Sequence, residues 1–158
     1  MTDRESPPPS QSSRETAIGQ VTVVAEGGWI RKVVIGAAAP GPGGGEDSLS
    51  RAAVDAIEAW LRGGPWPRGF PLRAEGTAFQ RRVWAALLEI PPGSRLTYGA
   101  LADRLGTSPR AVGGACRANP IPLLIPCHRV VAAGGAGGFA GHREGRWVEI
   151  KRWLLAHE

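Results

Sequence analysis

A cysteine followed directly by a histidine and an arginine is the first feature of this sequence that could carry chemistry. Cys127, His128 and Arg129 follow Pro126, and residues 119–126 hold three prolines. Because a cysteine thiol has a pKa of about 8.5, only a few per cent is thiolate at neutral pH, and a neighbouring imidazole raises that fraction. The alternative interpretation is a small buried hydrophobic residue. The segment therefore offers Cys127 as a candidate nucleophile and His128 as its candidate base.

The backbone around these two residues must be irregular if they are to work together. Neighbouring residues of an extended strand point to opposite faces, so an ordinary strand would separate the thiol from the imidazole. Pro126 fixes the backbone directly before Cys127. We therefore expect irregular backbone or a bridging water between Cys127 and His128.

Composition bounds the class of protein. The 158 residues are 42% hydrophobic and 21% charged, which predicts one ordinary domain or two small ones with a packed core. Two cysteines cannot form a disulfide framework or a four-thiolate zinc site. The apolar stretches are far shorter than a membrane span, and the polar N-terminus does not resemble a secretory signal. We therefore expect a cytoplasmic protein with reduced thiols and no membrane partner.

Charge is unevenly distributed along the chain. Residues 1–65 carry six Lys or Arg and eight Asp or Glu, a net charge of −2, whereas residues 66–158 carry thirteen and six, a net of +7. Twelve of those thirteen are arginines, which suit forked contacts to phosphates. The basic second half favours a polyanion partner. A general preference for Arg over Lys is the alternative explanation.

The first half of the chain reads as a small α/β unit. Residues 1–14 are polar and proline-rich, which predicts a disordered tail. Residues 20–26 and 29–35 are β-branched runs separated by two glycines, which predicts a hairpin. Residues 47–61 have helical spacing, with Asp47 as the expected N-cap. We expect an N-terminal domain over 15–65 and a linker over 66–74.

The second half, residues 75–158, reads as helices with an irregular tail. Apolar spacing predicts helices over 77–90, 97–105 and 109–117. The last two are joined by a short glycine-containing turn, which is the pattern of a helix-turn-helix. Arg110 and Arg117 lie on the second helix of this pair, together with small residues that allow close backbone approach. Many helical hairpins bind nothing, so this pattern alone does not establish DNA binding.

Several motifs together resemble the O6-alkylguanine-DNA alkyltransferases, also called methylated-DNA–protein-cysteine methyltransferases. They are Pro-Cys-His-Arg-Val-Val at 126–131, Arg-Ala-Val-Gly at 110–113, Asn119-Pro120, Gly-Thr-Ala-Phe-Gln at 76–80, Thr97-Tyr98, Phe-Ala-Gly at 139–141 and Trp-Leu-Leu-Ala-His-Glu at 153–158. The resemblance covers essentially all of residues 75–158 in the family's order. It implies an α+β protein with a small N-terminal α/β domain and a helical, winged-helix-like C-terminal domain.

The same resemblance implies direct repair of alkylated DNA. Cys127 would accept the alkyl group irreversibly, activated through a water by His128, and each molecule would act once. Glu158 would orient the imidazole; as the last residue of the sequence, it would also bring an α-carboxylate. Tyr98 would protonate the departing guanine. This chemistry uses no cofactor and no metal.

The partner implied by the resemblance is double-stranded DNA containing O6-alkylguanine. The recognition helix would enter the minor groove without sequence preference, the damaged nucleotide would be flipped out, and Arg110 would fill the gap. The protein would act as a monomer. The implied DNA-binding residues are Thr97, Tyr98, Arg110, Ala111, Gly113, Gly114 and Arg117. The implied pocket and structural residues are Cys116, Asn119, Pro122, Gly138, Phe139 and Ala140.

Two departures from the family pattern stand out. Residues 1–115 contain no Cys and no His, so the N-terminal zinc site of some relatives cannot form. His142 and Arg143 stand where relatives have small residues, which bears on the range of alkyl groups.

Three other functions compete with alkyl transfer. An alkyltransferase-like protein would bind damaged DNA without an acceptor thiol, which Cys127 argues against. A helix-turn-helix regulator would need a dimerisation or ligand domain that the sequence does not suggest. A Cys-His hydrolase would need an oxyanion hole, and no segment resembles one.

Overall fold

The chain folds into two compact units, residues 1–74 and 75–158, each described here by itself. The computed structural model describes residues 9–36, 45–135, 137 and 145–158. Gly138, Phe139 and Ala140 of the expected pocket, and the departures at His142 and Arg143, lie outside the described residues. None of the helices in the described part of the chain is long and apolar enough to cross a membrane.

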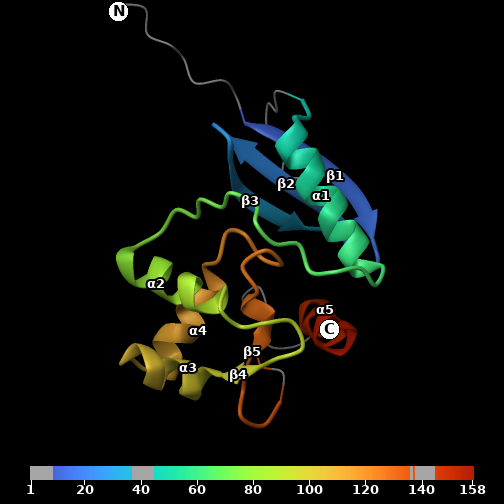
Figure 1. The fold of residues 1–158 in the computed structure, drawn as a ribbon. Helices are drawn as coiled ribbons and strands as arrows, with labels where there is room; N and C mark the ends of the chain where they lie inside the picture. The colour runs from blue at the N-terminus through green and yellow to red at the C-terminus, as the bar shows by residue number, and fades with distance from the viewer. Residues whose placement is uncertain (1–8, 37–44, 136, 138–144) are drawn as a thin grey trace, which may run out of the picture. The chain divides into compact units, whose positions relative to one another are not determined.

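The first unit is a three-stranded antiparallel sheet covered by one helix (Figure 1). Strands β1 (Ser10–Thr16), β2 (Gly19–Glu26) and β3 (Trp29–Ile35) lie in that order. The β2–β3 turn is Gly27-Gly28, and both glycines have positive φ, as a two-residue hairpin turn requires. The predicted hairpin is therefore confirmed.

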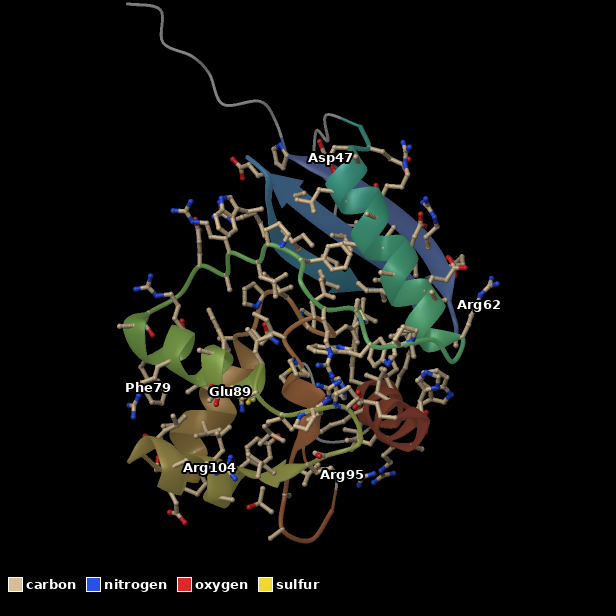
Figure 2. The ribbon with its side chains drawn as sticks, viewed as in Figure 1. Asp47, Arg62, Phe79, Glu89, Arg95 and Arg104 are labelled. Atoms are coloured by element: carbon tan, nitrogen blue, oxygen red, sulfur yellow. The ribbon has the colours of Figure 1, made fainter. Side chains whose placement is uncertain are left out.

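Helix α1 (Ser48–Leu61) packs on β1 and β2 through its apolar face. Asp47 caps the helix as predicted: its side chain accepts a 2.7 Å hydrogen bond from the amide of Ser50. Figure 2 shows Asp47 at the start of α1 and Arg62 at its end. The core between helix and sheet consists of Val21, Val23, Ala25, Ile30, Val33, Ala53, Val54 and Ile57.

Two expectations about this unit were wrong. Residues 10–14 belong to β1 rather than to a disordered tail, because an edge strand needs main-chain partners more than apolar side chains. Ser12 faces the core, where its hydroxyl lies 2.8 Å from that of Ser50. The end of the expected linker also joins the sheet, since Ile30 bonds through its backbone to Pro71 and Arg73.

The second unit begins with three helices, each capped at its N-terminus by a Thr or Ser side chain. Helices α2 (Ala78–Leu87), α3 (Tyr98–Leu105) and α4 (Pro109–Arg117) are capped by Thr77, Thr97 and Ser108. The α-helical part of the first ends at Leu87, and residues 88–90 continue as a hydrogen-bonded turn. Gly106 ends α3 in the left-handed conformation, and this short connection places α4 against α3.

The rest of this unit is more regular than predicted. A 3₁₀ turn, η1 (Cys127–Arg129), leads into β5 (Val130–Val131), which pairs in parallel with β4 (Leu96–Thr97). Helix α5 (Arg146–His157) occupies what the sequence suggested was irregular chain. Its buried face includes Val148, Lys151 and Leu154. Because Lys151 is charged, the apolar spacing that would have predicted this helix is broken at that position. The α+β fold class is confirmed.

Candidate active site

The segment that leads to Cys127 is held by the side chain of Asn119. Its amide nitrogen donates a 2.9 Å hydrogen bond to the carbonyl of Ile125, and its oxygen accepts one of 2.9 Å from the amide of Ile121. Leu123 lies between them, fully buried, with a positive φ of 74°. A leucine adopts this conformation only where its surroundings enforce it. Asn119 therefore braces a strained turn that fixes the cysteine.

Cys127 opens the 3₁₀ turn and is only partly exposed. Its amide bonds to the Ile125 carbonyl at 2.8 Å. Burial raises the pKa of the Cys127 thiol above its ordinary value, while a hydrogen bond from Asn119 and the nearby charge of Lys151 lower it. Since burial dominates, the resting group is a thiol that needs a base before it can attack.

His128, Arg129 and Glu158 form a buried charged cluster beside the thiol segment. His128 Nε2 lies 2.8 Å from Glu158 Oε1, and the side chains of all three residues are at most 1% exposed. Arg129 Nε lies 3.1 Å from each oxygen of the same carboxylate, and its Nη2 donates to Oε2. The structure thus brings His128 and Glu158 together as the sequence analysis expected.

The pKa values in this cluster favour a neutral imidazole beside an ionised carboxylate. Burial lowers the pKa of His128, outweighing the opposite effect of Glu158. Burial alone would raise the pKa of Glu158, but hydrogen bonds from His128 and Arg129 lower it to about 2. His128 can therefore accept a proton at neutral pH, and Glu158 can balance the charge that results.

A second polar pair lies where α3 begins. Burial raises the pKa of Tyr98 to about 12, so its hydroxyl is protonated at neutral pH. Lys151 Nζ lies 3.3 Å from that hydroxyl and donates a 2.7 Å hydrogen bond to the carbonyl of Val130. Lys151 is 1% exposed, and burial lowers its pKa to about 8.

Arg129 and Lys151 are the residues that sequence reasoning missed. The sequence analysis names Arg129 only as a neighbour of the thiol. In the structure it donates hydrogen bonds to the carboxylate of Glu158 and one of 2.7 Å to the carbonyl of Ile90. Lys151 was given no role. The sequence pattern that could have identified Lys151 is a lysine at a position of α5 where helical spacing predicts a buried apolar side chain.

Helix α4 presents a surface of small residues and arginines. Arg110, Gly114 and Arg117 are exposed, and Ala111 and Gly113 are half-buried. A Cβ at Gly113 or Gly114 would meet no heavy atom within 4 Å, so this part of the helix is open to a partner. On the buried side of α4, the indole nitrogen of Trp84 in α2 donates a 2.8 Å hydrogen bond to the carbonyl of Ala115 and so holds α4 against α2.

Three further predicted residues, Thr97, Cys116 and Pro122, lie in the described part of the unit. Thr97 caps α3 through a 3.0 Å hydrogen bond from the amide of Ala100. Cys116 in α4 is partly exposed, and burial raises its pKa to about 12, which makes it a poor nucleophile. Pro122 lies in the braced turn and bridges to Ile125. Among the described residues, no group of three or more His, Cys, Asp or Glu is arranged to hold a metal ion.

Comparisons with known proteins give a consistent result. The family model described as "6-O-methylguanine DNA methyltransferase, DNA binding domain" matches residues 78–158. The methylated-DNA–protein-cysteine methyltransferase of Saccharolobus islandicus strain L.S.2.15 is 40% identical over 113 residues, which is 72% of each chain. That of Metallosphaera sedula is 48% identical over 88 residues, 56% of this chain and 53% of the relative.

Solved structures extend the likeness to both units. The O6-methylguanine methyltransferase of Mycobacterium tuberculosis is 32% identical with a TM-score of 0.82, over 94% of this chain and 92% of that one. A structure of the M. tuberculosis protein in complex with DNA is 33% identical with a TM-score of 0.78, over 93% and 91% of the two chains.

Proposed function

The chain belongs to the 6-O-methylguanine DNA methyltransferase family, and we propose that it repairs DNA by moving an alkyl group from guanine O6 onto Cys127. The observation that points to Cys127 is that burial keeps its side chain a thiol and that the next residue in the chain, His128, pairs with Glu158. Relatives are named methylated-DNA–protein-cysteine methyltransferases, which agrees with a cysteine acceptor.

The proposed reaction begins with removal of the thiol proton. His128 takes this proton through a bridging water, and Glu158 stabilises the imidazolium that forms. The thiolate then attacks the alkyl carbon, forming the sulfur–carbon bond as the carbon–O6 bond breaks. Tyr98 donates its hydroxyl proton to a ring nitrogen of the departing guanine, which leaves as a neutral base. The resulting tyrosinate recovers a proton from solvent or from the imidazolium.

The product explains why each molecule would act once. A thioether is not hydrolysed at useful rates in water, and the scheme supplies no group that would remove the alkyl chain from sulfur. The acceptor, the base and the acid of this scheme all come from this chain, and the alkyl group comes from the DNA, so the scheme needs no cofactor. We assign Cys116 to the packing of α4 and not to the chemistry.

The proposed substrate is double-stranded DNA. Guanine O6 is inaccessible inside a duplex, so the damaged nucleotide must be flipped out at a cost of a few kcal/mol. The exposed surface of α4 supports docking in the minor groove, where small residues allow close approach and arginines meet phosphates. In this proposal Arg110 fills the gap left by the flipped nucleotide, and a single copy of the chain suffices.

Intact-mass analysis with a duplex containing O6-methylguanine tests the proposal. The wild-type protein should gain one methyl group, located on Cys127 by peptide mapping. Cys127→Ala should gain none yet still bind the duplex, and the matched variant Cys116→Ala should still be methylated. Methylation found mainly on Cys116, or transfer that survives in Cys127→Ala, would overturn the site assignment.

A further inference from the structure

One arginine determines how the carboxylate of Glu158 is presented to the imidazole. Arg129 and His128 share the two oxygens of Glu158: Oε1 contacts His128 Nε2 at 2.8 Å and Arg129 Nε at 3.1 Å, while Oε2 accepts from Nε and Nη2 of the arginine. The forked contact fixes the plane of the carboxylate, because a guanidinium and a carboxylate match in geometry only when coplanar.

The arginine is itself held from another direction. Its Nη1 donates a 2.7 Å hydrogen bond to the carbonyl of Ile90, which follows α2, and its side chain is fully buried. Glu158 extends from the end of α5, where a helix ordinarily frays. The contact with Arg129 therefore ties the end of α5 to the segment after α2.

The protonation of the imidazole follows from this arrangement. An ionised carboxylate has no proton to donate, so the ring nitrogen that faces it must carry the hydrogen. With Nε2 protonated, Nδ1 is the nitrogen that can accept the thiol proton in the proposed reaction. A neutral Glu158 would instead donate to Nε2 and force the ring proton onto Nδ1, where it would block the base.

We propose that Arg129 is a positioning residue that selects the reactive tautomer of His128, by keeping Glu158 ionised and aligned with Nε2. The effect on alkyl transfer rests on the proposed function, whereas the tautomer of His128 follows from the contacts of Glu158 alone. Loss of the positive charge would leave a buried carboxylate with the imidazole as its remaining charge partner in the cluster. Glu158 would then hold a proton or give one to His128, and either outcome puts a proton on Nδ1.

Nitrogen-15 NMR of the imidazole rings measures the tautomer directly in the full chain. The sequence has three histidines, so the His128 signals can be assigned by comparing samples with His142→Gln and His157→Gln. At neutral pH, wild-type His128 should show a protonated Nε2 and an unprotonated Nδ1. An Nδ1 that carries the proton in the wild type would overturn the proposal at once.

Two substitutions test the dependence on Arg129. Arg129→Gln removes the charge and should place a proton on Nδ1 and slow transfer at least a hundredfold, since a wrong tautomer costs about 10⁴-fold in a serine protease triad. Arg129→Lys keeps the charge and should leave Nδ1 unprotonated, with a loss of rate below about tenfold. Arg152→Gln, at an exposed arginine of α5, is the matched control and should leave the His128 signals unchanged.

The outcomes separate this inference from the proposed function. An unprotonated Nδ1 in Arg129→Gln, or a protonated one in Arg129→Lys, overturns the role of Arg129 whatever the transfer rate. If Arg129→Gln does not fold, the wild type and Arg129→Lys decide the question alone. If the tautomer depends on Arg129 as stated but the wild type transfers no methyl group, the proposed function fails and the tautomer assignment stands.

Discussion

The ammonium nitrogen of Lys151 lies 3.3 Å from the hydroxyl oxygen of Tyr98, and its charge also lies 5.5 Å from the centre of the tyrosine ring. The lysine comes from α5 and the tyrosine from the start of α3, so the contact joins two distant parts of the chain. The same nitrogen binds the carbonyl of Val130, two residues past the histidine. Lys151 thus fixes the proposed proton donor relative to the strand that follows the acceptor cysteine.

Replacing this lysine should impair the reaction. Lys151→Met keeps the length of the side chain but removes the charge that lowers the Cys127 pKa and the hydrogen bond to Val130. We expect transfer to slow about tenfold or more, which corresponds to about 1.4 kcal/mol or more. Single-turnover transfer to O6-benzylguanine would measure it; a rate within twofold of the wild type would contradict the prediction.

The same variant should change how stability depends on pH. Burial lowers the pKa of Lys151 to about 8 from an ordinary 10.5, so between these values the unfolded state binds more protons than the folded state. Stability from this group therefore rises with pH across that window. Urea unfolding at pH 7 and pH 10 should show wild type gaining stability relative to Lys151→Met; an unchanged difference would contradict the shift.

Removing the carboxylate from the proposed base pair should slow transfer in a pH-dependent way. In Glu158→Gln the imidazolium that forms loses its partner, so we expect a loss of roughly ten- to a hundredfold at about pH 7. The deficit should shrink towards pH 9, because more of the thiol ionises without help. A variant that matches the wild type over this range would remove Glu158 from the mechanism.

Arg110 should matter for duplex DNA more than for the free base. Arg110→Ala should slow repair of a duplex far more than it slows reaction with O6-benzylguanine, because a free base leaves no gap to fill. Rates with the two substrates, measured beside the control Arg104→Ala at an exposed arginine of α3, would show the difference. Equal losses with both substrates would assign Arg110 a structural role.

The indole of Trp84 should contribute to stability through its hydrogen bond to α4. Trp84→Phe removes the donor and leaves the buried Ala115 carbonyl without this partner, which costs about 1–3 kcal/mol. Trp153→Phe, at an exposed tryptophan of α5, is the matched control and should cost less. Urea unfolding would compare them, and equal losses would mean that the hydrogen bond contributes little.

Much of the secondary structure could be predicted because it depends on local chemistry. Asp47, Thr77, Thr97 and Ser108 cap their helices wherever the rest of the chain lies, and Gly27-Gly28 suits only a tight turn. Local sequence patterns could not predict an element whose partner is distant in sequence. Strand β1 looks polar and disordered by itself, and it forms because β2 supplies the matching hydrogen bonds.

The family could be predicted from the sequence, and so could Cys127 and His128 as candidates for the acceptor and its base, because these residues are contiguous and their motifs are specific. The groups that surround these two residues could not be predicted, because they come from distant parts of the chain. Arg129 meets Glu158 across 29 residues and Lys151 meets Tyr98 across 53, distances over which no local spacing rule operates. The charge of a buried side chain is set by the groups that face it, and those groups become known only once the chain has folded.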